Sequence, residues 1–466
     1  MAGIKVNDMA DYATRITGGR VYVHGDLVEA DVLIDDGIIV GLLRAGDDAS
    51  AQNVIDATGK IVLPGIIDTH AHTREPGYTH KEDFYTASRA AAVGGITTMI
   101  DMPNVEPPTD TVETFLEKRE LADGKSIIDW GHWVAGTKPE EIPKLAAAGA
   151  TGYKTFQVSG AYPHDPRLAL NDEGKLISSF RAIAETGLPS LVHPFNQALF
   201  EKLSAEAFAA GKPSDWRTFG EVYTTEEIWH TAVNTLINLQ RITGVRLHIV
   251  HTHSGKSLDL VREAKAAGQR VTAAVDPKYY HLTLKDLDEK KGRACPGGFI
   301  TGDPERMAKI WRALEDGTMD MIDADHAPHT LEELEQLDTD AWNGAMGSPQ
   351  YDWQYSITLT DVNDGKLSLR RAVELLAETP AKFLGIYPKK GVLTPGADAD
   401  LVIVDMDREH ILSDDNLQTK VGWTPYVGWK IKGYVELTML RGTVIAKERE
   451  VLGEAGYGRY IAGVAQ

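Results

Sequence analysis

The order of apolar and polar positions divides the middle of the chain into repeating units. Eight short apolar runs, rich in β-branched residues, each break into polar residues before a segment with helical spacing follows. Apolar residues at consecutive positions are typical of a parallel strand that is buried on both faces. The eight runs are GIIDTHAH, GITTMIDMP, DWGHWVAG, GYKTFQV, PSLVHPF, VRLHIVHTH, RVTAAVDP and MDMIDADHAP.

The helical segments between these runs mostly end in glycine, which tolerates the left-handed conformation just past a helix. These glycines are Gly94, Gly124, Gly149, Gly187, Gly244, Gly268 and Gly317. Eight strands that alternate with helices predict a (β/α)8 TIM barrel. An open doubly wound sheet is the alternative, but the first strand lacks the G-x-G-x-x-G turn that would favour it.

Both ends of the chain differ from the middle because they contain short alternating strands with tight turns. RVYVHG, EADVLIDDGIIVGLL and KIVLPG lie near the start, and GADADLVIVDMD and YVELTMLRGTVIAKE lie near the end. We expect one small β-sandwich domain built from residues 1–62 plus 392–466, beside a barrel domain of residues 63–391. Two unrelated β extensions remain the alternative.

Composition narrows the classes of partner. The 466 residues are 42% hydrophobic and 25% charged, as in globular proteins, and no apolar run approaches the roughly 20 residues of a membrane span. A formal net charge of −20 argues against nucleic acid and anionic membranes as partners. The single cysteine, Cys295, excludes an intrachain disulfide. Because the start shows no signal-peptide pattern, we predict a cytoplasmic location.

Potential metal ligands occupy the polar ends of five of the eight runs. In a TIM barrel all these carboxyl ends open onto one face, where catalysis takes place. Four imidazoles, one carboxylate and one lysine that meet there predict a two-metal hydrolytic site. A lone H-x-H pair could equally be structural, but the further residues at strand ends argue against coincidence. The six candidates are His70, His72, Lys154, His193, His251 and Asp325.

Lys154 is the unusual member of this set, because an ammonium group beside two divalent cations would be repelled. Either the metals depress its pKa or the side chain is chemically modified. Carbamylation by CO2 would convert the lysine into an anionic bridge with two oxygens between the ions. An ordinary lysine paired with an acidic neighbour at the barrel rim is the alternative.

Asp325, in DADHAPH, is the candidate catalytic residue. One carboxylate oxygen could ligate a metal while the other faces a bridging hydroxide, which two metal ions make nucleophilic near neutral pH. The aspartate would take up the proton during attack and return it to the leaving nitrogen.

The segment GIIDTHAHTREPGYTHKEDFYTASRAAAVGGITTMIDMPNVEPPT resembles the cyclic amidohydrolases of the amidohydrolase superfamily, which include dihydroorotase, allantoinase, and hydantoinase or dihydropyrimidinase. The similarity continues through GYKTF, LVHPF, HIVHTHS, DADHAPH and GADADLVIVD to TPYVGWKIKG. It implies two Zn2+ ions bridged by a carboxylated Lys154, a cyclic amide as substrate, and a homodimer or homotetramer. His70, His72, Lys154 and Asp325 would hold one zinc, and Lys154, His193 and His251 the other.

The resemblance also bears on the substrate. Dihydroorotase-like sequences bind the substrate carboxylate through residues that correspond to Arg74, Asn104 and His329, all present here. An arginine, a histidine and an amide also suit a carboxylate on chemical grounds. We therefore predict a dihydroorotase-like hydrolase of a ring that bears a carboxylate. The alternative for Arg74 is a salt bridge with Glu75 or another rim acid.

Several segments depart from the dihydroorotase pattern. Phe195 stands where the family usually has an acidic residue, RACPGGFITGD replaces a PPLR-type loop, and DPKYYH replaces a CPH-type motif. The length and the tail HILSDDNLQTKVGWTPYVG are closer to allantoinase or hydantoinase. A hydrolase of an uncharged or ureido ring is therefore the alternative function. Tyr162 is a candidate oxyanion donor by analogy with hydantoinases, at a longer spacing from the lysine.

Other classes and residues carry less weight. A non-catalytic scaffold relative would have lost ligands, and a mononuclear deaminase would lack the bridging lysine. Two histidines near the predicted mouth, His253 and His281, are possible substrate contacts. Six further histidines outside the ligand pattern are interpreted as surface or core residues: His80, His132, His164, His230, His248 and His410.

Overall fold

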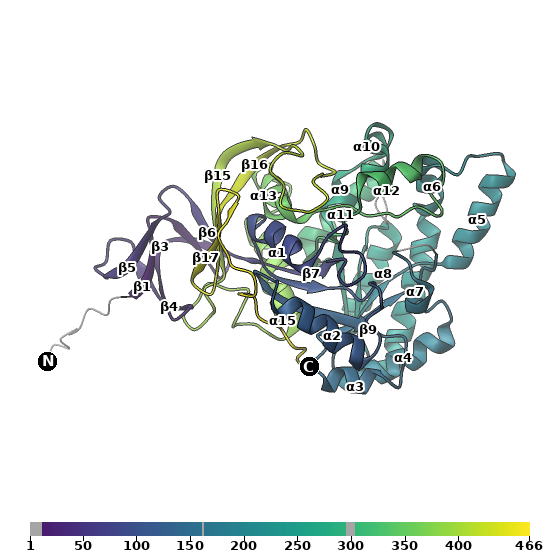
Figure 1. Ribbon diagram of the computed structural model, residues 1–466, viewed down its shortest axis with the longest axis horizontal. Helices are drawn as coiled ribbons and strands as arrows, with labels where there is room; N and C mark the ends of the chain where they lie inside the picture. Colours follow the sequence, from purple (N-terminus) through teal and green to yellow (C-terminus); the bar gives the residue numbers. More distant parts are fainter. Residues whose placement is uncertain (1–11, 161–162, 295–302) are drawn as a thin grey trace.

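The structure, a computed structural model, describes residues 12–160, 163–294 and 303–466 (Figure 1). Cys295 and Tyr162 lie outside the described residues. A barrel with its surrounding helices forms one part of the molecule, and a sheet made from both ends of the chain forms the other (Figure 1).

Eight parallel strands form the barrel, with each strand hydrogen-bonded to the next along the chain. An isolated parallel bridge from Ala71 to His326 joins the last strand to the first, and the backbone N–H of His72 donates to the carbonyl of His326 at 2.8 Å. The predicted TIM barrel is thereby confirmed, with a strand inside each of the eight predicted runs. They are β7 (Ile66–Ala71), β8 (Ile96–Asp101), β9 (Asp129–Ala135), β10 (Gly152–Phe156), β11 (Pro189–His193), β12 (Arg246–Ile249), β13 (Val271–Val275) and β14 (Met321–Ile322).

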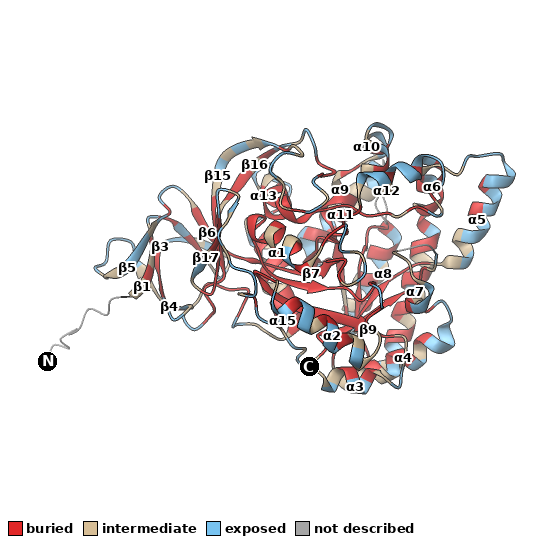
Figure 2. Cartoon of the chain, in the orientation of Figure 1, coloured by how far each residue is buried: buried red, intermediate tan, exposed pale blue. Residues whose placement is uncertain are grey.

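Helices follow each barrel strand and surround the sheet (Figure 1). The helices are α1 (Phe84–Val93), α2 (Val112–Asp123), α3 (Ile142–Ala147), α4 (Glu173–Thr186), α5 (Gln197–Ala209), α6 (Trp216–Tyr223), α7 (Glu226–Thr243), α8 (Gly255–Ala266), α9 (Pro277–His281), α10 (Leu284–Lys290), α11 (Pro304–Asp316), α12 (Leu331–Glu335), α13 (Gln354–Asn363), α14 (Leu369–Val373) and α15 (Thr379–Leu384). Figure 2 shows buried barrel strands inside helices whose outer faces are exposed, the burial pattern that the apolar runs predict.

Glycine ends several of these helices, for two different reasons. Gly187, Gly244 and Gly317 adopt the predicted left-handed conformation, with φ of 69°, 71° and 83°. The predicted helix ends at Gly94 and Gly124 are also confirmed, but with right-handed backbone, where φ is −85° and −87°. At Gly94 a Cβ atom would lie 1.8 Å from the carbonyl oxygen of Tyr351, so close backbone approach is what requires glycine there.

The two ends of the chain meet in one curled, mixed sheet of ten strands, which confirms a small β domain built from both termini. Its strands are β1 (Tyr12–Thr17), β2 (Arg20–Val23), β3 (Asp26–Asp35), β4 (Ile38–Arg44), β5 (Ala51–Asp56), β6 (Ile61–Pro64), β15 (Leu401–Ile411), β16 (Lys430–Leu440), β17 (Thr443–Lys447) and β18 (Glu450–Val451). β6 pairs antiparallel with β15, which ties the two ends together. The exact division at residues 62 and 392 stays a proposal.

A single residue, Gly65, joins this sheet to the barrel, because β6 ends at Pro64 and β7 begins at Ile66. A Cβ atom at Gly65 would lie 2.3 Å from Cγ2 of Thr97, so the junction has no room for a side chain. This short connection fixes the start of the strand that carries His70. None of the helices among the described residues has the length and apolar character needed to cross a membrane.

Candidate metal centre

The barrel brings the six predicted ligands to one end. His70 lies in β7, Lys154 in β10 and His193 at the last position of β11, while His72, His251 and Asp325 lie one, two and three positions after their strands. The ring centroid of His251 lies 4.9 Å from that of His70 and 4.9 Å from that of His193. Five of the six border one small cavity, whose walls are His70, His72, Arg74, Asn104, Phe156, Pro163, His164, His193, His251, Asp325, Ala327 and Met346.

Asp325 stands at the centre of this group. Its Oδ1 atom lies 3.3 Å from Nε2 of His70 and 3.3 Å from Nε2 of His72. Asp325 and His251 also have positive φ angles, of 43° and 55°, although neither is glycine. Strained backbone of this kind is retained where the surrounding structure requires it, which is common at functional sites.

Three of the imidazoles, those of His70, His72 and His251, have a polar contact at Nδ1. Nδ1 of His70 lies 3.4 Å from the Asp323 carboxylate. Nδ1 of His72 lies 2.8 Å from the amide oxygen of Asn104, and Nδ1 of His251 lies 3.2 Å from Asp276. The hydrogen bonds at Nδ1 hold the rings of His72 and His251 in one orientation and leave Nε2 as the nitrogen available to a ligand.

Burial favours the neutral form of three of the predicted ligands, His70, His72 and His193. It lowers the pKa of His72 to about 4, despite the opposing hydrogen bond to Asp325. Burial also lowers the pKa values of His70 and His193 well below the ordinary value of histidine. A neutral imidazole has the free lone pair that ligation requires. Nε2 of His193 is buried and has no hydrogen-bond partner among the described residues, as expected of an atom meant for a ligand.

Lys154 is fully buried, and its Nζ atom has no hydrogen-bond partner in the described part of the chain. Burial lowers the pKa of Lys154 to about 7, against the attraction of Asp325 and Asp323. The rim ion pair considered as the alternative is therefore not what holds this side chain. The amine of Lys154 is therefore buried near Asp325 and Asp323 without a hydrogen bond among the described residues.

Two overlapping groups of ligand atoms fit a metal ion among the described residues. His70, His72 and Asp325 form one group, and His251, Asp276 and Asp325 form the other, with ligand atoms within 4.8 Å of one another in each. Nitrogen and carboxylate ligands in this number suit zinc or a similar divalent ion. Asp276 was not predicted as part of this centre.

Of the three residues predicted to bind a substrate carboxylate, Arg74 and Asn104 border the cavity and His329 does not. Arg74 is fully buried, borders the cavity, and donates from Nε to the carbonyl of Pro328 at 3.0 Å. Its NH2 group lies 3.0 Å from Nε2 of His329, which is not among the cavity walls. Asn104 borders the cavity and holds His72. The structure thus places Arg74 next to the metal ligands and His329 behind it.

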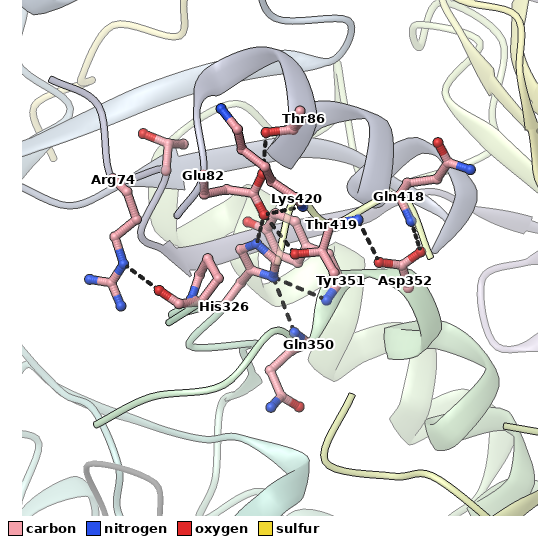
Figure 3. Close-up of polar contacts among 12 residues, drawn as sticks. Arg74, Glu82, Thr86, His326, Gln350, Tyr351, Asp352, Gln418, Thr419 and Lys420 are labelled. Carbon is pink, nitrogen blue, oxygen red and sulfur yellow. Dashed lines mark hydrogen bonds and ion pairs between the residues drawn. The ribbon is translucent and has the colours of Figure 1, made fainter. Parts of the chain in front are cut away.

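Behind the end of β14, a network connects the barrel to the C-terminal segment (Figure 3). Nδ1 of His326 accepts backbone N–H bonds from Gln350 and Tyr351 at 3.1 and 3.3 Å. Its Nε2 lies 3.5 Å from Glu82, whose carboxylate accepts a bond from the Thr419 hydroxyl at 2.6 Å. Since His326 directly follows Asp325, this network fixes the backbone that carries the candidate catalytic residue.

A second cavity of about 420 Å³ adjoins the metal cavity and shares His164 and Met346 with it. We call it the side chamber. Trp342 and Phe219 lie 5.2 Å apart between ring centroids, and Phe208 lies 4.7 Å from Trp342. The chamber's walls also include Val158, Ser159, Gly160, Gln197, Phe200, Glu201, Ser204, Ala205, Tyr223, Asn343 and Gly344. Most of this lining is apolar, so it suits an apolar group.

Sequence reasoning missed several residues of the centre. His164 was interpreted as a surface or core residue, yet it borders the cavity, with its ring centroid 5.8 Å from that of His193. It comes from a loop, where spacing carries no signal. Asp323 lies two positions before Asp325, so strand periodicity could have identified it. Of the two possible substrate contacts, His281 instead pairs with Asp361 at 2.8 Å, and His253 is buried.

Comparison with known proteins places this geometry in a family. The Amidohydrolase family model matches residues 61–445. An L-hydantoinase from Paenarthrobacter aurescens is 34% identical over 452 residues, which cover 95% of this chain and 96% of the relative. A dihydroorotase from Lactobacillus delbrueckii subsp. bulgaricus is 34% identical over 451 residues, which cover 94% and 99%.

The solved structures point the same way. The L-hydantoinase (dihydropyrimidinase) from Arthrobacter aurescens matches with a TM-score of 0.92 and 32% identity, over 97% of this chain and 100% of that one. The barrel, the converging histidines and aspartates, and full-length similarity to hydantoinases and dihydroorotases agree with one another. The chain therefore belongs to the amidohydrolase family and is a cyclic amidohydrolase, an enzyme that acts on cyclic amides.

Proposed function

We propose that this enzyme uses two divalent metal ions, most simply zinc, to open a cyclic amide ring that bears a carboxylate. Arg74 carries the choice of substrate. Its guanidinium is completely buried, borders the same cavity as five of the predicted ligands, and is the natural partner of a carboxylate.

The ligand assignment follows the six predicted residues. His70, His72, Lys154 and Asp325 would hold one ion, and Lys154, His193 and His251 the other. Two divalent ions held there would acidify a water molecule and polarise the ring carbonyl. The orphaned Nε2 of His193 and Nζ of Lys154 support this assignment, because buried polar atoms normally have partners.

Carboxylation of Lys154 is part of the proposal. A neutral amine adds to CO2 to give a carbamate and releases one proton, so the side chain changes from a neutral group to an anionic one. A lysine with a pKa of about 7 is neutral in a large fraction of molecules at neutral pH, so the reactive form is available. The product would supply the negative charge and the two oxygens that a bridge requires.

Asp325 is the proposed proton carrier. It would accept a proton from the attacking water as the C–O bond forms, and return it to the ring nitrogen as the C–N bond breaks. Asp323 and Asn104 would keep His70 and His72 in the ligating orientation. Arg74, supported by His329, would hold the substrate carboxylate, and Asn104 borders the same space.

The side chamber favours a second candidate. A hydantoin or dihydropyrimidine ring with an apolar substituent would place the ring at the metals and the substituent among Phe219, Trp342 and their neighbours. The similarity to an L-hydantoinase supports this possibility. On this alternative, Arg74 would be a structural residue that ties Pro328 to the cavity wall.

Ring-opening assays separate the two candidates. Zinc-loaded wild type and Arg74→Met would be measured on dihydroorotate, hydantoin, 5-benzylhydantoin, dihydrouracil and allantoin. The carboxylate proposal expects turnover of dihydroorotate, with kcat/KM about 100-fold or more lower in Arg74→Met because a charged hydrogen-bonded pair is lost. Preferred turnover of 5-benzylhydantoin, equal in both proteins, would establish the second candidate. Turnover of none of the five rings would contradict both.

The predicted homodimer or homotetramer and the cytoplasmic location stay predictions. The scaffold alternative is excluded because the chain is a cyclic amidohydrolase. Metal content of the purified enzyme tests the remaining alternative, a mononuclear site, since the proposal requires two equivalents per chain.

A further inference from the structure

The segment after β13 has no role in the proposed reaction, although it lies against the metal centre. Asp276 follows the strand, and Lys278 lies in the first turn of α9; both are fully buried. Asp276 occupies the N-cap position of α9, but its side chain makes no capping hydrogen bond. Its carboxylate is therefore committed elsewhere, to the residues of the centre.

Asp276 and Lys278 form a continuous line of polar contacts between two predicted metal ligands. Oδ2 of Asp276 lies 3.2 Å from Nδ1 of His251, and Oδ1 lies 2.7 Å from Nζ of Lys278. Nζ of Lys278 then donates to Oδ2 of Asp325 at 2.9 Å. This line connects a ligand assigned to one ion with a ligand assigned to the other.

The order of charges along this line explains why a lysine is needed. Asp276 and Asp325 are two buried carboxylates whose ligand atoms, with one from His251, lie within 4.8 Å of one another. The ammonium of Lys278 lies between them, so it compensates both and competes with any cation drawn to Asp276. Removal of the ammonium would leave two buried like charges facing each other.

The same contact orients Asp325. Its Oδ2 atom is held by Lys278, while its Oδ1 atom faces His70 and His72. A carboxylate bound at one oxygen cannot rotate freely, so the oxygen that meets the metal is defined. Neither Asp276 nor Lys278 borders the cavity, so they act through Asp325 and His251 and not on the substrate.

We propose that Asp276 and Lys278 are a pair of positioning residues that orient His251 and Asp325 together and hold the two metal sites in register. This role rests on the proposed function, since it takes His251 and Asp325 as metal ligands. The pair is a specific feature of DPKYYH, the segment in which the sequence departs from the CPH-type motif of the family.

The test uses the full-length enzyme, loaded with Zn2+ for kinetics and with Co2+ for visible spectra. Lys278→Met removes the charge and keeps a similar length. We expect kcat to fall about 10- to 100-fold with little change in KM, and the Co2+ absorption band to shift, because ligand geometry changes while the substrate contacts remain. Lys278→Arg, which keeps the positive charge, should recover part of kcat and the wild-type band.

Asp276→Asn is the second variant, because it preserves size and folding if Lys278→Met does not fold. It leaves Lys278 bound to Asp325 and weakens the hold on His251, so we expect a smaller loss of kcat and again a shifted band. In the double variant the two losses should not add, since the residues act as one unit. Lys144→Met, on the exposed surface of α3, is the control that should change neither readout.

The outcomes distinguish failure of the positioning role from failure of the proposed two-metal function. Wild type that binds fewer than two metal ions per chain, or that opens no ring, overturns both. An active wild type with two ions, whose Lys278→Met and Asp276→Asn variants keep its kcat and Co2+ band, overturns the positioning role alone. Equal losses of kcat in Lys278→Met and Lys278→Arg, with an unshifted Co2+ band, would also overturn the positioning role. They would indicate that the packing of the Lys278 side chain matters and its charge does not.

Discussion

Two walls of the metal cavity are built in different ways. The strand wall consists of cavity residues at or shortly after strand ends, with Lys154 beside them although it does not border the cavity: His70, His72, His193, His251 and Asp325. The loop wall consists of Pro163, His164, Ala327 and Met346, and it continues into the side chamber. Side chains of the strand wall are oriented by further buried polar groups, whereas the loop wall is mostly apolar and comes from connecting segments and from α5 and α6.

This difference separates chemistry from selectivity. Residues at strand ends are fixed by the ladder of the barrel, so they suit metal ligation, which requires accurate geometry. Loops vary in length and composition without disturbing the barrel, so they suit the choice of substrate. α5 and α6, which supply much of the chamber, lie at the end of the molecule opposite the N-terminal strands (Figure 1). The same barrel can therefore carry one ring-opening reaction while different loops select different ring substrates.

Replacing Lys154 by alanine is the most severe test of the strand wall. We expect the enzyme to lose one of its two metal ions and about 10³-fold or more in kcat, about 4 kcal/mol of transition-state stabilisation. Metal analysis of the dialysed protein and steady-state kinetics on the best ring substrate measure this. Lys144→Ala, at an exposed position, is the matched control. Full activity with one metal would instead support a mononuclear enzyme.

Asn104 contacts both walls, so its variants can separate an effect on metal binding from an effect on substrate binding. Its Oδ1 atom lies 2.8 Å from Nδ1 of His72, and its Nδ2 atom donates to the carbonyl of Pro163 at 3.2 Å. Asn104→Ala should lower metal affinity or kcat about 10- to 100-fold, because His72 loses its orienting partner. Asn104→Asp keeps an acceptor for His72 and removes the donor to Pro163.

For Asn104→Asp we therefore expect metal affinity close to that of wild type and a raised KM. Competition with a chromogenic chelator gives the affinity, and initial rates give KM. If Asn104→Asp loses metal as strongly as Asn104→Ala, the contact between Oδ1 of Asn104 and His72 is not what maintains metal affinity.

The strand wall could be predicted from sequence because its residues obey the geometry of the barrel. An apolar run predicts a strand, its first polar residues mark the carboxyl end, and His70 and His72 two positions apart point to one face. Asp323 follows the same rule and was overlooked only because Asp325 already filled the expected role. The helix end at Gly94 was predicted correctly, but the close approach of Tyr351 that requires glycine there depends on tertiary packing.

The loop wall could not be predicted in this way. His164 and Trp342 are far apart in sequence and meet around the chamber only after the barrel has closed. Lys278 lies in DPKYYH, which departs from the motif of the family, but its contact with Asp325 cannot be derived from that departure. Periodicity determines which face of a strand a side chain occupies; it carries no information on where a long loop returns.

The smallest expected effect belongs to the loop wall. Trp342→Ala would enlarge the side chamber without touching a predicted ligand, since its ring packs against Phe208 and Phe219 and its Nε1 donates to Ser204 at 3.0 Å. For 5-benzylhydantoin we expect kcat/KM to fall roughly tenfold, because an apolar pocket contributes selectivity of this order. For hydantoin, which has no substituent to fill the chamber, the loss should be much smaller. The ratio of the two kcat/KM values, measured in wild type and variant on the same preparation, is the readout. Equal losses on both rings would mean that Trp342 supports the cavity as a whole, and the division between a catalytic strand wall and a selective loop wall would then fail at this position.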